Sequence, residues 1–188
     1  MPDEVVVASK NPSKVREVEE VLASLGVHVV SGLQWPDVEE TGGTLEENAL
    51  LKARAVAEAT GRAALADDTG LEVAALQGEP GVLTGRFGGP KATDQDNVVH
   101  LLQALEGEVE RRARFRTVVA LVRPDGQEVV AEGVLEGHIA RSPRGEGGFG
   151  YDPVFEVEGR TLAELPIHAK HAVSHRGRAL RALVERLG

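Results

Sequence analysis

The chain has 188 residues, of which 41% are hydrophobic and 3% aromatic, and its formal net charge is −9. One domain is the simplest interpretation of this length, with two lobes as the alternative, and the core must be built from Val, Leu and Ala. The acidic balance excludes strong non-specific nucleic-acid binding, which depends on cation–phosphate contacts, and the absence of cysteine excludes disulfide and thiolate chemistry.

No segment is expected to cross a membrane. The longest apolar runs, such as 118–122, are far too short to span a bilayer. The acidic start, Met1 to Glu4, lacks the basic region and the long apolar stretch of a signal peptide. We therefore expect a cytoplasmic protein without membrane contacts.

The first half of the chain alternates predicted strands and helices. Pro12 suits the first turn of a helix whose apolar residues recur at helical spacing as far as Leu25. Thr44 and Glu47 fit a capping box before an alanine-rich helix. The predicted elements are a strand at 5–8, a helix at 13–25, a strand at 27–30 and a helix at 49–59.

The rest of the chain adds a short apolar run at 63–66 and a long hairpin. Residues 112–122 and 127–139 alternate around Pro124-Asp125-Gly126, which predicts two paired strands. Further predicted elements are a helix from Thr93 or Asp94 to Leu105, a strand at 154–157 and a helix from Ser174 to Leu187. Strand–helix units followed by a hairpin indicate an α/β fold with a mixed sheet.

Polar residues at the first strand–helix junction suit a phosphate. The segment is Ser9-Lys10-Asn11-Pro12-Ser13-Lys14, and it offers helix N-terminal N–H groups, a hydroxyl, an amide and ammonium groups. Taken alone, however, a simple Ser/Asn helix cap is the interpretation we favour. The segment is not a P-loop, because the glycines and the Lys-Ser/Thr pair are missing.

Paired acids follow the apolar run 63–66 and precede Thr69 and Gly70. A strand that ends in Asp67-Asp68 would place both at the rim of a sheet, with only one acid facing a given site. The alternative is a turn, for which Asp-Asp-Thr-Gly is a good sequence.

Other carboxylates lie near the second helix. Glu39 or Glu40 could complete a metal site begun by Asp68, because Mg²⁺ takes one or two protein carboxylates together with water and phosphate oxygens. For Glu46 and Glu47 we favour a role at a solvated helix N-terminus, where acids are stabilising.

A glycine-rich loop carries two of the few aromatic residues, in Gly147-Gly148-Phe149-Gly150-Tyr151-Asp152-Pro153. Phe149 or Tyr151 could stack on a flat base, while the backbone or Asp152 reads its edge. A flexible loop with one anchoring aromatic is the less favoured alternative.

Cations and histidines gather before the last predicted helix. His168, His171 and His175 could form a metal cluster, but Lys170 and Arg176 lie among them and would repel a dication. We therefore interpret Lys170, His175 and Arg176 as substrate contacts, and His168 and His171 as surface residues. Arg86 is a further candidate contact for phosphate or a partner subunit, or else an exposed loop arginine.

These clusters resemble, in order and over nearly the whole chain, the inosine/xanthosine triphosphate pyrophosphatase family, also called dITP/XTP pyrophosphatase or RdgB-like. The motifs that carry the resemblance are Ala8-Ser9-x-Asn11-x-x-Lys14, Thr44-x-x-Glu47-Asn48-Ala49-x-x-Lys52-Ala53, Ala66-Asp67-Asp68-Thr69-Gly70-Leu71, Pro80-Gly81-Val82, Gly147 to Pro153 and Ser174-His175-Arg176-Gly177-x-Ala179-Leu180.

The resemblance implies an elongated mixed β-sheet flanked by helices, two lobes around a central cleft, and a homodimer. It implies one pyrophosphatase domain over 1–188 that hydrolyses ITP, dITP and XTP to the monophosphate and pyrophosphate with Mg²⁺. By position, Asp68 resembles the metal-linked general base and Glu39 the second metal carboxylate, with Glu40 its rival. The implied substrate contacts are Ser9 to Lys14, Thr69, Phe149, Gly150, Tyr151, Asp152, Lys170, His175 and Arg176.

Three positions depart from the pattern, namely Leu45 for a common Phe, His171 for an Asn-like residue and Lys10 for a small residue. None of these departures removes a required functional group, and Lys10 bears on the detailed geometry of the phosphate loop. The rival functions are a pyrophosphatase with another base preference, a nucleotide-sensing binding module and a zinc protein.

Overall fold

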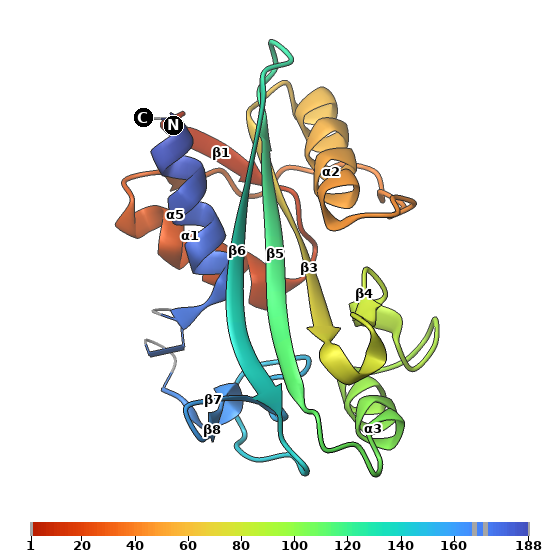
Figure 1. The fold of residues 1–188 in the computed structure, drawn as a ribbon. Helices are drawn as coiled ribbons and strands as arrows, with labels where there is room; N and C mark the ends of the chain where they lie inside the picture. The colour runs from red at the N-terminus through yellow and green to blue at the C-terminus, as the bar shows by residue number, and fades with distance from the viewer. Residues whose placement is uncertain (1, 167–168, 171–172, 188) are drawn as a thin grey trace. The chain divides into compact units, whose positions relative to one another are not determined.

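A computed structural model describes residues 2–166, 169–170 and 173–187 of the chain. Within them, the strands form one sheet in the order β2-β1-β3-β5-β6-β7-β8, with β4 beside β3 (Figure 1). The strands are β1 (Glu4–Val7), β2 (His28–Val29), β3 (Ala64–Val73), β4 (Pro80–Gly81), β5 (Arg112–Val122), β6 (Glu128–Ile139), β7 (Phe155–Val157) and β8 (Arg160–Thr161).

The sheet is mixed, because β1 runs parallel to β2 and β3 while β4 is antiparallel to β3 and β7 to β6. The helices are α1 (Pro12–Ser24), α2 (Leu45–Thr60), α3 (Asp94–Ala104) and α5 (His175–Leu187), and short 3₁₀ turns occupy Ala74–Leu76, Thr84–Arg86 and Leu162–Glu164. The predicted α/β fold with a mixed sheet is confirmed.

The chain divides into two compact units. The first consists of Met1–Asp68, Thr117–Val134 and His175–Gly188, and the second of Thr69–Arg116 and Leu135–Ser174. The chain goes from one unit to the other four times. The first three of these points lie inside the long strands β3, β5 and β6, and the fourth lies at the start of α5. The single domain over 1–188 and the cleft between two lobes stay predictions.

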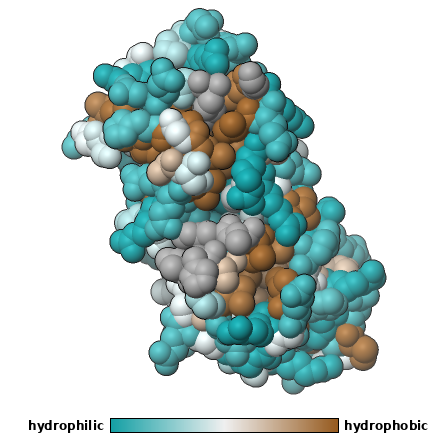
Figure 2. Space-filling view, turned by 90° about the vertical axis from the view of Figure 1, so that its left-hand side faces the viewer, coloured by the Kyte–Doolittle hydropathy of each residue, from teal (hydrophilic) through white to brown (hydrophobic). Residues whose placement is uncertain are grey.

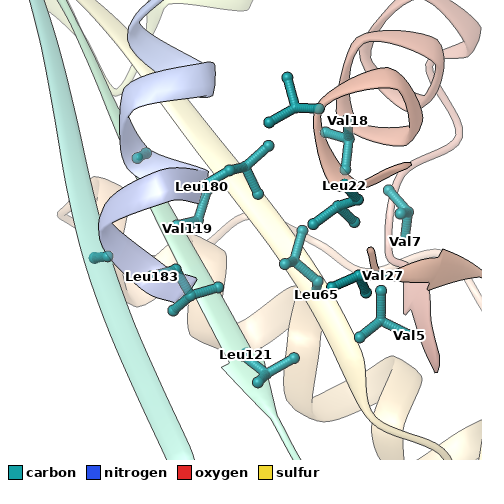
Figure 3. Packing of buried hydrophobic residues seen from close by; sticks show 13 residues of the cluster. Val5, Val7, Val18, Leu22, Val27, Leu65, Val119, Leu121, Leu180 and Leu183 are labelled. Atoms are coloured by element: carbon teal, nitrogen blue, oxygen red, sulfur yellow. The ribbon is translucent and has the colours of Figure 1, made fainter. Parts of the chain in front are cut away.

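The first unit has an aliphatic core, as the composition requires. Helical spacing places Val18, Val21 and Leu22 of α1 on one buried face, and Leu180 and Leu183 do the same for α5. Figure 3 shows these side chains gathered with others from β1, β3 and β5. Full burial of each such side chain contributes about 1.5–3 kcal/mol, so this core fixes α1 and α5 against the sheet.

The second unit is built around aromatic and aliphatic side chains. The rings of Phe115 and Phe155 lie 4.5 Å apart between centroids. Gly137 is required beside them, because a Cβ there would lie 2.7 Å from the Phe155 ring. Tyr151, one of the two residues predicted to stack on a base, belongs to the same buried cluster.

The predicted end of the third strand is wrong. β3 continues from Ala64 through both acids to Val73, so Asp67 and Asp68 lie inside a strand rather than at its rim or in a turn. Both are buried, with 3% and 7% of their surface exposed. Acids can occupy such positions only where cations and hydrogen-bond donors compensate them.

No helix among the described residues is long and apolar enough to cross a membrane. On the face seen in Figure 2, hydrophilic residues predominate and hydrophobic residues gather in smaller areas between them.

Candidate functional site

The predicted phosphate loop is a well-formed helix start. Asn11 is the N-cap of α1, and its side-chain oxygen accepts hydrogen bonds from the N–H groups of Ser13 at 3.0 Å and Lys14 at 3.4 Å. Pro12 occupies the first turn, and the Ser9 hydroxyl accepts from the Asn11 N–H. The cap interpretation is therefore confirmed, while phosphate binding by this segment stays a prediction.

A cavity of about 400 Å³ lies beside this loop in the first unit. The segment 35–40, which contains no helix or strand, forms another part of its wall. Its lining residues are Ala8, Ser9, Lys10, Asn11, Lys14, Trp35, Asp37, Val38, Glu40, Lys52, Val56 and Asp67. Lys10, Lys14 and Lys52 are the cations of this cavity that could attract the phosphate groups of a ligand.

Asp68 is held by two residues of α2. Asn48 donates its amide hydrogen to Asp68 Oδ2 at 3.2 Å, and Lys52 Nζ lies 3.4 Å from Asp68 Oδ1. Asn48 and Lys52 are four residues apart, so helical geometry puts them on one face. The capping box of Thr44 and Glu47 fixes where that helix begins.

Burial raises the pKa of Asp68, and the neighbouring Glu40 adds to this effect, although Lys52 opposes it. The Lys52 ammonium has the opposite balance: burial alone would lower its pKa, but Asp68, Asp67 and Glu40 together raise it. Lys52 thus remains a cation beside a carboxyl of enhanced basicity, which suits a general base. Lys52 has no predicted role, and the signal in the sequence that could have indicated one is its spacing of four residues from Asn48.

The Asp67 carboxylate belongs to a buried ion cluster. Arg176 Nε donates to Asp67 Oδ2 at 3.1 Å, and Arg176 Nη1 donates to Glu17 Oε2. Lys14 Nζ approaches the same Asp67 oxygen at 3.6 Å. Burial opposes ionisation of Asp67, but Lys14, Arg176 and Lys52 outweigh it and hold the pKa of Asp67 below its usual range.

The partners of the Asp67 carboxylate thus include Arg176 and Lys14. The two carboxyl groups pair with different elements, that of Asp67 with the helices α1 and α5 and that of Asp68 with the helix α2, as expected for adjacent strand residues. Arg176 is a fully buried side chain, and its substrate contact stays a prediction. The role of Glu17 as a partner of Arg176 was not predicted from the sequence. The available signal was an acid directly before Val18, on the apolar face of α1.

The start of α5 lies tightly against β6. A Cβ on Gly133 would lie 2.2 Å from the His175 carbonyl oxygen, so only glycine permits this approach. The buried His175 ring meets the Thr117 hydroxyl at 2.6 Å through Nδ1. His175 is thereby oriented, and its role toward substrate stays a prediction.

In the second unit, the glycine-rich loop meets Lys170. Asp152 Oδ2 accepts from the Phe149 N–H at 2.7 Å and from Lys170 Nζ at 2.6 Å. Lys170 Nζ also lies 4.8 Å from the centroid of the half-buried Phe149 ring. Gly148 has φ +79° and a Cβ there would lie 2.0 Å from Asp152 Oδ2, so the loop requires glycine.

The Tyr151 side chain is part of the core of the second unit. The residue is 3% exposed, and its hydroxyl donates a hydrogen bond to the Thr84 carbonyl at 2.9 Å. Burial raises the pKa of the Tyr151 hydroxyl above its ordinary value. The burial of this ring favours Phe149 over Tyr151 as the stacking residue, and contact of Tyr151 with substrate stays a prediction. Phe149 is left as the stacking candidate, while the Gly150 N–H is bonded to Asp94.

The donor set near Asp68 fits a hard cation. Lys52 Nζ lies 2.6 Å from Glu40 Oε1 and 3.4 Å from Asp68 Oδ1, so one positive charge already joins two carboxylates. Two carboxylates are what Mg²⁺ commonly takes from a protein. Glu39 is exposed, and its role as a ligand stays a prediction beside Glu40.

Within the described part of the chain, no group of three or more His, Asp or Glu residues is arranged to hold a metal. His168 and His171 lie outside the described residues. Glu46 and Glu47 are at the N-terminus of α2, as favoured, and Glu47 accepts from the N–H groups of Gly43 and Thr44. Thr69 is half-buried and Arg86 exposed.

Comparison with known proteins identifies relatives over almost the full chain. A dITP/XTP pyrophosphatase from Thermus thermophilus is 54% identical over 190 residues, covering 96% of this chain and 90% of the relative. A protein of the same name from Geobacter sulfurreducens is 50% identical and covers 98% of this chain and 96% of the relative.

Solved structures agree with this relationship. A HAM1 protein from Coxiella burnetii matches with a TM-score of 0.88 and 46% identity, covering 98% of both chains. The Ham1 protein of Staphylococcus aureus matches with a TM-score of 0.85 and 40% identity, over 98% of this chain and 97% of that one. A family model described as the Ham1 family matches residues 5–186. The resemblance inferred from the motifs is thus confirmed, and the chain belongs to the Ham1 family.

Proposed function

We propose that this protein hydrolyses deaminated purine nucleoside triphosphates, namely ITP, dITP and XTP, to the monophosphate and pyrophosphate in a Mg²⁺-dependent reaction. The observation that carries the proposal is the cavity of the first unit. Its lining includes Lys10, Lys14 and Lys52 together with Glu40 and Asp67. Relatives about half identical to this chain bear the name dITP/XTP pyrophosphatase.

The lysines of the cavity supply the electrostatic part of the reaction. Ammonium groups directed into a confined space stabilise the negative charge that develops on the phosphates as the bond to the α-phosphorus breaks. Lys14 is restrained by Asp67 and Lys52 by its two carboxylates, so these charges are oriented before substrate arrives.

Asp68 is the proposed general base. Its raised pKa enables its carboxylate to take a proton from the attacking water, while the Asn48 amide fixes the orientation of the carboxylate. Asp68 with Glu40 or Glu39 would hold Mg²⁺, which when bound offsets phosphate charge and polarises phosphoryl oxygens.

Selection of the base is assigned to the second unit. Phe149 would stack on the purine, and the loop backbone would read its 6-keto edge. A 6-amino group presents a donor where an acceptor is wanted and leaves buried groups unpaired, which disfavours ATP. Lys170, held by Asp152, is the proposed cationic contact of this loop. We further propose a homodimer located in the cytoplasm.

The test is pyrophosphate release from ITP, dITP, XTP, GTP and ATP, with Mg²⁺ and with EDTA. We expect rapid release from the first three nucleotides only, and only with Mg²⁺. Asp68→Asn should lose nearly all turnover while its circular dichroism spectrum is unchanged. Nucleotide binding without pyrophosphate release would indicate a binding module, and preference for a modified pyrimidine or 7-methyl-GTP would indicate another pyrophosphatase.

A further inference from the structure

Each of the three lysines that line the cavity of the first unit is paired with a carboxylate that also lines it. Lys10 is paired with Asp37, Lys52 with Glu40 and Lys14 with Asp67. All six residues line the cavity. Three positive and three negative side chains cancel, so an entering polyphosphate meets cations that are neutralised by the protein itself.

The three ion pairs differ in how easily a ligand can replace the carboxylate partner of the lysine. The Asp67 side chain is 2% exposed and cannot leave Lys14 without abandoning a buried cluster. The side chains of Lys10 and Asp37 are 56% and 90% exposed. An ion pair in solvent is weak, because water screens the attraction and two long side chains lose conformational freedom. Lys10 is therefore the first cation that a ligand can take over.

Asp37 lies within the segment 31–43, which forms neither helix nor strand. Trp35 and Glu40 belong to the same segment and line the same cavity. Displacing Asp37 from Lys10 thus requires no rearrangement of a regular element.

We propose that Asp37 is an internal competitor that occupies Lys10 in the ligand-free protein and must be displaced by a bound polyphosphate. The residue weakens the affinity of the cavity for polyphosphates, including the pyrophosphate product, and thereby favours product release. The product role rests on the proposed function, whereas the competition itself is a binding property that can be measured without turnover.

The experiment measures pyrophosphate affinity by titration calorimetry at low ionic strength without divalent metal. Asp37→Asn removes the competing charge and keeps the side-chain size. Asp125→Asn is the matched control, because Asp125 is an exposed acid in the β5–β6 turn outside the cavity. Trp35 is the only tryptophan of the chain, so a fluorescence change on titration locates binding at this cavity.

Asp37→Asn should bind pyrophosphate about three- to fivefold more tightly than the unmodified protein, the range that an exposed ion pair supports. Asp125→Asn should change affinity less than twofold, and raising the salt to 0.5 M should reduce the gain. In a Lys10→Ser background the Asp37→Asn gain should vanish, since the competitor then has nothing to occupy.

Equal affinities for Asp37→Asn and Asp125→Asn would overturn the inference, as would a gain that persists in the Lys10→Ser background. An unmodified protein and Asp37→Asn variant that both fail to bind pyrophosphate would overturn it as well. These outcomes are independent of the nucleotide assay, which alone decides the proposed function.

Discussion

The adjacent acids of β3 should affect stability in opposite directions. Asp67 and Asp68 are both buried, but Asp67 is surrounded by more compensating charge. We therefore compare Asp67→Asn with Asp68→Asn, two substitutions that remove one charge, keep the side-chain volume and leave no cavity.

The magnitude for Asp67 follows from its two cation contacts. Arg176 Nε lies 3.1 Å and Lys14 Nζ 3.6 Å from Asp67 Oδ2, and the side chains of Asp67 and Arg176 are each 2% exposed. Removing one partner of a buried ion pair costs about 3–5 kcal/mol, because the other charge stays buried and uncompensated. Arg176 keeps Glu17, so we expect the lower end, about 3 kcal/mol, which lowers the melting temperature by about 6–12 °C.

Asp68→Asn should not destabilise the metal-free protein. The pKa of Asp68 is raised in the folded state, with burial as the main cause. The folded protein therefore binds this proton more tightly than the unfolded chain, and ionised Asp68 lowers stability at neutral pH. Asparagine removes that penalty and can still accept from the Asn48 amide.

The assay is urea unfolding followed by far-ultraviolet circular dichroism at pH 7.5 without divalent metal, repeated at lower pH. The pKa of Asp67 is lowered in the folded state, so its contribution is fully present above the unfolded value of about 3.9 and is lost as the pH falls toward the folded value. The deficit of Asp67→Asn should accordingly shrink in acid. A deficit under about 1 kcal/mol at pH 7.5, or an equal deficit in both variants, would refute the reasoning.

The remaining predictions concern the loop and the cation of the site. Tyr151→Phe should cost about 1 kcal/mol of unfolding free energy, the worth of one hydrogen bond, and leave KM for ITP within twofold; a large rise in KM would return this ring to the substrate. Gly148→Ala should destabilise more and raise KM, since its Cβ meets Asp152, whereas Gly150→Ala has similar positive φ but open space and should cost only backbone strain in thermal unfolding; equal effects on KM would contradict the clash. Lys52→Met should abolish turnover yet bind Mg²⁺ alone more tightly in calorimetry, because two carboxylates lose the ammonium that joins them; unchanged Mg²⁺ affinity would argue against a metal there.

Local chemistry made most of the fold predictable. The Asn11-Pro12 start of α1 and the capping box at Thr44 satisfy helix N–H groups with residues three positions away or fewer, so their signals are contained in a few letters. The β5–β6 hairpin was equally readable, because its turn and the two strands are contiguous. Local compensation of this kind does not depend on what the rest of the chain does.

β3 could not be predicted in the same way. Two adjacent acids and the nearby Gly70 disfavour a strand by local propensity, and the strand persists because partners distant in sequence compensate the acids. Arg176 is 109 residues from Asp67, and Lys52 is 16 residues from Asp68. The burial of Tyr151 was equally hard to predict, since the Thr84 carbonyl that accepts its hydroxyl hydrogen bond is 67 residues away.

By itself, then, the sequence determined the order of the elements, the helix starts and the motifs that place the chain in its family. Only the tertiary structure decided which charge neutralises which: Asp67 with Arg176 and Lys14, Asp68 with Lys52, and Asp37 with Lys10. The physical reason is range. Hydrogen bonds of caps and turns close within a few residues, whereas a buried charge is satisfied by whichever side chain the packed core brings beside it.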